Sequence, residues 1–257
     1  MSTDPCEKPD PRWLDGDFER KWRERFERFA DQEEDAAIAG WSRHGLEARL
    51  AHFRMRWTPE GNGPLWLDAG CGAGTYTRYL EQRGKRVLAL DYSLPTIEKA
   101  RSRGTGDTLW TLGDAGRLPL ADDSLDGALC FGVTQALSAS DALVTELARV
   151  VRGGGEVWLD GLNGGSAFDL WARGARKVRG EPAEVRFESP RRLARLLRRR
   201  GVRNLQLYWV PVMPEGWSRL QRLFNRPWAA RALDHAPGAG RLLCHAFVLK
   251  GEAPHAQ

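Results

Sequence analysis

The segment LWLDAGCGAG at residues 65–74 combines a short apolar run, an aspartate and three glycines at alternate positions. The apolar run predicts a buried strand, and Asp68 stands at its end. Gly70, Gly72 and Gly74 allow a ligand to approach the backbone closely, and a helix predicted over 75–83 would present its positive end to that ligand. The turn could therefore hold a dinucleotide, a nucleoside triphosphate or another nucleotide-like cofactor.

The glycine spacing separates these three kinds of ligand. A phosphate-binding loop for nucleoside triphosphates requires G-x-x-x-x-G-K-[ST], whereas residues 70–77 read GCGAGTYT and contain no lysine. The dinucleotide pattern G-x-G-x-x-G/A fails as well, because Thr75 occupies its sixth position. The spacing D-x-G-x-G-x-G suits a carboxylate and a nucleoside as well as a pyrophosphate.

Strands and helices alternate along the chain after Pro64. The predicted strands are 65–68, 86–91, 108–112, 126–131, 156–160, 204–210 and 242–249, and the predicted helices are 75–83, 95–103, 141–151 and 190–200. This alternation predicts an α/β fold with a mostly parallel sheet covered on both faces. Ligands bind such sheets beyond the carboxyl ends of the strands, so Asp68, Asp91, the 112–116 loop and Phe131 should share one crevice.

Ordered sequence blocks extend this pattern beyond the glycine loop. They read LDAGCGAGTYTRYLEQRGKRVLALDYS, then LGDAGRLPLADDSLDGALC, then ELARVVRGGGEVWLD. Together, over about residues 64–161, they resemble class I S-adenosylmethionine (SAM)-dependent methyltransferases, and most closely the small-molecule group that includes quinone-biosynthesis-like enzymes. The resemblance implies a Rossmann-like, seven-stranded, mostly parallel sheet with an antiparallel last strand. It also implies SAM as the cofactor and a methyltransferase activity.

The resemblance implies a role for each residue that matches the family pattern. Asp68 and the glycine loop would face the methionine part of SAM. Asp91 would accept hydrogen bonds from the ribose hydroxyls, and Phe131–Val133 would line the methyl-donor face. The implied cofactor-binding residues are Asp68, Ala69, Gly70, Gly72, Gly74, Asp91, Tyr92, Asp114, Ala115, Phe131 and Gly132. Helix capping is the alternative for Asp68 and Asp91, and a simple turn is the alternative for Asp114.

The chain departs from the family pattern at two places. Gly116 replaces a residue that is often acidic or polar, and R-G-G-G at 152–155 replaces the usual K-P-G-G turn. Neither change is expected to touch the cofactor.

The flanking segments contain no motif for a particular substrate. We expect a flexible tail over 1–15, a helical lid over 16–60 with helices at 17–37 and 45–57, and a SAM-binding domain over 61–257. Trp41 is a candidate member of the lid. Residues 211–240 form an insertion whose apolar stripe lies beside arginines. Amphipathicity favours a cap on the substrate pocket, and the alternative is a helix on an anionic membrane surface.

No strong base motif accompanies the cofactor pattern. His44, in the joint WSRHG, and His245, on the last predicted strand, are the weak candidates for catalysis. The tetrapeptide FGVT at 131–134 differs from the [DN]-P-P-[YFW] of enzymes that methylate base amines, which argues against DNA as the acceptor. The four cysteines show no C-x-x-C spacing and no histidine cluster near them, which argues against a zinc site. A clustered Asp/Asp/Asn set for Mg²⁺ is not evident either, so we expect no metal.

Charge and composition leave several partners open. The net charge of +5 predicts a basic surface, which could bind nucleic acid, anionic lipid or an acidic substrate. The alternative is a solvated face rich in arginine. The polar N-terminus is no secretory signal, and no apolar run reaches the roughly 18 residues of a membrane span. We therefore expect a cytoplasmic protein, which could also bind peripherally to the inner face of the membrane.

Three functions are compatible with these sequence features. The first is a SAM-dependent methyltransferase that acts on a small or lipid-like acceptor, at oxygen or carbon. The second is an RNA-modifying methyltransferase guided by the basic surface. The third is a SAM-binding regulatory or partner protein without methyl transfer.

Overall fold

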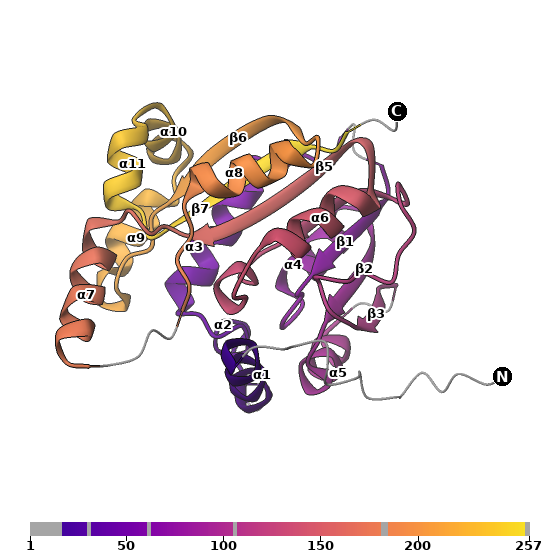
Figure 1. The fold of residues 1–257 in the computed structure, drawn as a ribbon, viewed down its shortest axis with the longest axis horizontal. Helices are drawn as coiled ribbons and strands as arrows, with labels where there is room; N and C mark the ends of the chain where they lie inside the picture. Colours follow the sequence, from indigo (N-terminus) through magenta and orange to yellow (C-terminus); the bar gives the residue numbers. More distant parts are fainter. Residues whose placement is uncertain (1–16, 30–31, 61–62, 105–106, 181–184, 255–257) are drawn as a thin grey trace.

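The structure is a computed structural model that describes residues 17–29, 32–60, 63–104, 107–180 and 185–254. The tail predicted for residues 1–15 lies outside them. Figure 1 shows a twisted central sheet with helices packed on both faces and a group of helices beyond one end. None of the helices in the described ranges is long and apolar enough to cross a membrane.

One sheet contains all seven strands found in the described residues, in the order β3-β2-β1-β4-β5-β7-β6. The strands are β1 (Leu65–Ala69), β2 (Arg86–Asp91), β3 (Leu109–Leu112), β4 (Leu125–Cys130), β5 (Val151–Leu162), β6 (Arg203–Val210) and β7 (Ala246–Glu252). β1 pairs in parallel with β2 and β4, whereas β7 lies antiparallel to β5 and β6. The predicted sheet is confirmed, and its topological switch point lies at β1 and β4.

The helices connect the strands and extend the fold at both ends of the chain. They are α1 (Asp17–Phe29), α2 (Asp35–Ile38), α3 (Arg43–Arg54), α4 (Thr75–Glu81), α5 (Leu94–Ser102), α6 (Asp141–Val150), α7 (Ala167–Val178), α8 (Pro190–Arg199), α9 (Ser218–Phe224), α10 (Pro227–His235) and α11 (Pro237–Leu243). Short 3₁₀ helices occur at Thr134–Ala136 and Glu215–Trp217.

The two faces of the sheet are buried under different kinds of side chain. On one face, leucines of α6 and α8 such as Leu147 and Leu193 pack in the same cluster as Ala128 of β4. On the other face, the ring of Phe53 in α3 lies 5.0 Å from that of Trp158 and 5.6 Å from that of Phe131. A buried side chain of this size contributes about 1.5–3 kcal/mol, so α3 is part of the core.

Four segments differ from the expected elements. The single helix predicted over 17–37 is two helices, α1 and α2. The glycines at 153–155 lie inside β5 and do not form a turn before it. Glycine is needed at position 155, because a Cβ there would fall 2.5 Å from the carbonyl oxygen of Asp126 on the neighbouring strand. Residues 242 and 243 end α11 instead of opening the last strand. Finally, α7 was not predicted from the sequence, although its apolar residues recur at helical spacing.

Candidate functional site

The glycine loop between β1 and α4 is held against the end of β2. The amides of Gly70 and Cys71 both donate to the carbonyl oxygen of Leu90, at 2.7 and 3.0 Å. Gly70 has a φ of +75°, and a Cβ there would lie 2.2 Å from Cγ2 of Val133. Glycine is thus required at this position for both backbone conformation and space. The loop joins the carboxyl ends of β1, β2 and β4 at one point.

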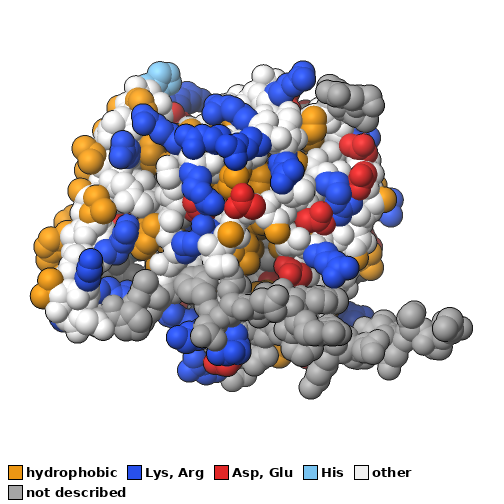
Figure 2. Space-filling view, in the orientation of Figure 1, with side chains coloured by type: hydrophobic (Ala, Val, Ile, Leu, Met, Phe, Trp, Pro, Cys, Tyr) orange, Lys and Arg blue, Asp and Glu red, His pale blue; other side chains and the backbone are white. Residues whose placement is uncertain are grey.

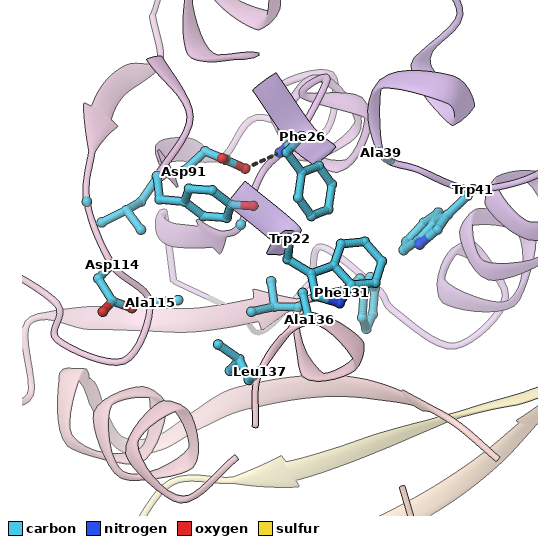
Figure 3. A pocket seen from close by; sticks show the side chains of 17 residues that line it. Trp22, Phe26, Ala39, Trp41, Asp91, Asp114, Ala115, Phe131, Ala136 and Leu137 are labelled. Atoms are coloured by element: carbon cyan, nitrogen blue, oxygen red, sulfur yellow. Dashed lines mark hydrogen bonds between the residues drawn. The ribbon is translucent and has the colours of Figure 1, made fainter. Parts of the chain in front are cut away.

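Asp91 ties the glycine loop to β2 through its carboxylate. One oxygen accepts a hydrogen bond from the amide of Gly72 at 2.9 Å (Figure 3), and the other accepts a hydrogen bond from the amide of Ser93 at 3.0 Å. Burial raises the pKa of Asp91, and these amide donors act against that rise. Each carboxylate oxygen can accept more than one hydrogen bond, so Asp91 retains acceptor capacity toward the pocket that it lines.

A pocket lies over this loop and is predominantly apolar (Figure 3). Its lining residues are Trp22, Phe26, Ala39, Trp41, Gly70, Gly72, Leu90, Asp91, Tyr92, Gly113, Asp114, Ala115, Phe131, Gly132, Val133, Ala136 and Leu137. Helix α1 supplies Trp22 and Phe26, and the ring of Phe26 meets that of Tyr92 edge-on at 5.8 Å. The N-terminal helices therefore cover the carboxyl ends of the strands.

Most of the cofactor-binding residues predicted from the sequence line this pocket. They are Gly70, Gly72, Asp91, Tyr92, Asp114, Ala115, Phe131 and Gly132. Asp68, Ala69 and Gly74 do not line it. The carboxylate of Asp68 is buried behind the loop, where it accepts from Oγ1 of Thr77 at 2.6 Å. The roles assigned to all of these residues in cofactor binding remain predictions.

The sequence pattern did not identify the aromatic pair on α1 or the residues Ala39, Ala136 and Leu137 as pocket residues. Trp22 and Phe26 stand four positions apart, so they share one helix face, and that spacing predicts no more than a packing stripe. Only their position opposite the glycine loop makes them pocket residues. Trp41, expected in the lid, does line the pocket.

A buried ion pair connects the N-terminal helices to the loop after β4. Arg49 of α3 donates from Nε to Asp160 of β5 at 2.8 Å, and both side chains are almost fully buried. The other oxygen of Asp160 accepts from the amide of Gly132 at 2.7 Å. The guanidinium of Arg49 also lies 4.5 Å from the ring centroid of Trp41. This network fixes two lining residues, Trp41 and Gly132, relative to each other.

The two histidine candidates lie outside the set of residues that line the pocket. His44 contacts the carbonyl oxygen of Met213 through Nδ1 and Oγ of Ser218 through Nε2, each at 3.1 Å. His245 lies 2.9 Å from the carboxylate of Asp169. His44 thus joins α3 to the 211–240 segment, and His245 joins α7 to the sheet. A catalytic role for either one remains a prediction.

Comparison with known proteins agrees with this geometry. A family model described as a methyltransferase domain matches residues 67–159, which include β1, the glycine loop and the strand ends around the pocket. Residues 67–159 therefore carry a methyltransferase domain, on a sheet with the Rossmann-like methyltransferase fold. The structural neighbours of this methyltransferase domain include a chain of the complex between the Haloferax volcanii Trm112 methyltransferase activator and a methyltransferase. That chain has a TM-score of 0.64 and 19% identity, over 91% of this chain and 98% of the neighbour.

One more solved structure shares the fold, and one relative shares part of the sequence. The magnesium protoporphyrin IX methyltransferase of Synechocystis PCC 6803, solved with S-adenosylhomocysteine, has a TM-score of 0.61 and 14% identity, over 92% of this chain and all of that one. A malonyl-[acyl-carrier protein] O-methyltransferase of Hamiltonella defensa is 38% identical over 126 residues, which are 48% of this chain and 47% of the relative. The match thus spans about half the length of that relative.

Asp68 gives the methyltransferase domain a predicted pH dependence. Burial raises the pKa of Asp68 from 3.8 to about 7, so its protonated form is favoured in the folded protein. This contribution to stability is complete at low pH and is lost as the pH rises from about 4 to about 7. The wild type should therefore lose about 2 kcal/mol of unfolding free energy between about pH 5 and about pH 7.5, and Asp68→Asn should lose less.

Urea denaturation at both pH values measures this difference. Asparagine retains an oxygen that can accept the hydrogen bond from Thr77. The variant therefore removes the titrating carboxyl group and keeps the hydrogen bond. Asp107→Asn, at an exposed position, is the control and should follow the wild type. Identical pH profiles for Asp68→Asn and the wild type would contradict the prediction.

Proposed function

We propose that the protein transfers a methyl group from SAM to an ionised oxygen of a small or lipid-like acceptor. The observation that carries this proposal is the chemistry of the pocket wall. Among the described lining residues, the charged side chains are Asp91 and Asp114 alone, and both are matched to cofactor roles by the family pattern. No histidine, lysine, arginine or cysteine of the described chain lines the pocket.

Such a wall favours an acceptor that needs no base. A carboxylate or phenolate has already lost its proton, whereas a protonated alcohol or amine has to release one during attack. The acceptor anion and the sulfonium cation of SAM also neutralise each other during methyl transfer. A water-poor, apolar site strengthens their attraction and aligns the two reactants for direct displacement.

Trp41 provides a polar group for the acceptor in this otherwise apolar wall. Its indole Nε1–H is buried and has no hydrogen-bond partner within the described structure. A buried donor without a partner is costly, so an acceptor oxygen that takes this hydrogen bond would relieve that cost. We assign Trp41 the role of a donor to the acceptor, with its ring held by Arg49.

The apolar lining also supports a lipid-like body for the acceptor. Trp22, Phe26 and Leu137 offer contact area without hydrogen-bonding demands, which suits an acyl chain or a ring. The Hamiltonella relative acts, by its name, on a malonyl group attached to acyl carrier protein, which is a carboxylate on a thioester-linked chain. This class of substrate is therefore the first to test, with the carrier protein as the partner. The cytoplasmic location remains a prediction.

The test is a methyl-transfer assay with the full chain and SAM. The acceptors are a malonyl thioester on acyl carrier protein, a medium-chain fatty acid, an alkyl phenol and bulk RNA, and the products are identified by mass spectrometry. We expect a methyl ester or ether and an equal amount of S-adenosylhomocysteine. Trp41→Phe should lower kcat/KM about tenfold to a hundredfold, because it removes one hydrogen bond to a charged group, and it should leave the affinity for S-adenosylhomocysteine unchanged.

Each other outcome selects a different function. Methylated RNA with no ester product would establish the RNA-modifying alternative. Cofactor binding without turnover on any of these acceptors would favour the regulatory alternative. A Trp41→Phe variant with full activity on the acceptor would remove the assigned role of the indole N–H.

A further inference from the structure

Helix α7 leaves most of its apolar side chains in contact with solvent. Within this helix the buried residue is Asp169, which faces His245. By contrast, Phe168 is 64% exposed, Trp171 is 71% exposed and Val178 is 89% exposed. A helix that packs on a folded domain normally turns such residues inward, and large exposed apolar patches mark interaction sites.

The exposed apolar side chains of α7 continue onto neighbouring helices. α11 packs against α7 and α10, and α10 packs against α9. We use the name apolar edge for the large exposed hydrophobic residues of these helices and of the 3₁₀ helix before α9, which are Phe168, Leu170, Trp171, Val178, Trp217, Leu223, Trp228, Leu242 and Leu243. Figure 2 shows hydrophobic side chains gathered along the left border of the molecule, where Figure 1 places α7 and α11.

Basic residues surround the apolar edge, whereas its acidic residues turn inward. The exposed cations on these helices and at the joint between α9 and α10 are Arg173, Lys177, Arg219, Arg222, Arg226, Arg231 and Arg241. The described helices α7, α9, α10 and α11 contain two carboxylates, Asp169 and Asp234. Asp169 pairs with His245, and Asp234 pairs with Arg56 at 2.7 Å. The outward charge of this surface is therefore positive.

We propose that the apolar edge binds the surface of an anionic lipid bilayer. Exposed Trp, Phe and Leu beside Arg and Lys are the combination that enters the boundary between headgroups and acyl chains. The apolar side chains would enter that boundary, while the cations would meet the lipid phosphates. The charge of the surface selects anionic over neutral lipid. The hydrogen bond between His245 and Asp169 and the ion pair between Arg56 and Asp234 hold α7 and α10 on the body, so the surface exists before binding.

This interaction is independent of methyl transfer, because none of the residues of the apolar edge lines the pocket. It also gives residues 211–240 a role other than the pocket cap expected from the sequence. Within the described structure, the residues that line the pocket all precede position 138. The segment instead packs on β6 and on α3.

Vesicle flotation with the full chain tests the proposal. The vesicles are phosphatidylcholine alone, and phosphatidylcholine mixed with phosphatidylglycerol. We expect flotation with the mixed vesicles and little with the neutral ones. Phe168→Ser/Trp171→Ser should weaken binding about tenfold or more. Leu109→Ser is the matched control, since Leu109 is 63% exposed on β3 at the opposite edge of the sheet, and it should bind as the wild type does.

A second pair of variants tests the charge. Arg173→Gln/Lys177→Gln should weaken binding to the mixed vesicles about tenfold, whereas Arg195→Gln/Arg199→Gln on α8 should change it much less. Raising the salt concentration should weaken wild-type binding in the same direction. Melting curves and S-adenosylhomocysteine affinity like those of the wild type show that the variants are folded.

Several results would overturn the proposal. One is a wild-type protein that floats with neither vesicle type at low salt. Another is equal binding by Phe168→Ser/Trp171→Ser and the wild type. A third is saturable binding of an acidic carrier protein to this surface without vesicle binding, which would identify a protein partner in place of the lipid.

Discussion

Replacing Arg49 with methionine is expected to lower the free energy of unfolding by about 3–5 kcal/mol, the largest stability effect that we predict for a single substitution. Arg49 is the partner that compensates the buried charge of Asp160. Methionine fills similar volume but leaves that carboxylate without its cation. Burial raises the pKa of Asp160, and Arg49 acts against the rise, so the variant should also bind a proton at Asp160 more readily.

Chemical denaturation of the variant and of two controls measures this effect. Arg49→Met/Asp160→Asn removes both charges and keeps an oxygen acceptor for the amide of Gly132, so it should recover most of the lost stability. Arg43→Met removes the cation of an exposed pair with Glu34 and should cost less than about 1 kcal/mol. Equal losses in Arg49→Met and Arg43→Met would contradict the proposed network.

The second large effect is expected on cofactor binding. Asp91→Ala should weaken the binding of SAM and S-adenosylhomocysteine by roughly a hundredfold to ten-thousandfold, because two hydrogen bonds to a charged acceptor contribute about 1.5–3 kcal/mol each. The alanine also releases the amide of Gly72, which Asp91 holds in the glycine loop. Calorimetric titration with S-adenosylhomocysteine gives the affinity directly.

Thermal melting with three ligands distinguishes a lost cofactor site from a general loss of stability. Wild type should be stabilised by SAM and S-adenosylhomocysteine and not by NAD⁺, and ligand at a hundred times its dissociation constant adds about 2.7 kcal/mol. Asp107→Ala, at an exposed carboxylate, should behave as the wild type. Stabilisation by NAD⁺ alone would instead mean that the loop at 70–74 holds a dinucleotide.

The sequence by itself determined the sheet and the position of the glycine loop. The strands have clear boundaries, because apolar runs such as 65–67 and 87–90 are followed by an aspartate at the carboxyl end. The alternation of strands and helices then requires a parallel sheet, which brings those ends together. Asp91, Asp114 and Gly132 could thus be placed on one pocket before any contact was known.

Tertiary structure alone decided which distant residues complete the site. Trp22 and Arg49 lie on helices whose sequence pattern shows an apolar face but not its partner. Arg49 meets Asp160 across 111 positions of sequence. Such a pair leaves no local signal, because each residue taken alone is typical of a solvated surface.

The same reason explains the surface of α7. Amphipathic periodicity shows that a helix has an apolar side, but it does not show whether the fold covers that side. Asp169 turns inward to His245, and Phe168 and Trp171 consequently face solvent. Local spacing therefore determined where the cofactor loop stands, whereas packing between segments far apart in the sequence decided what surrounds it and what remains exposed.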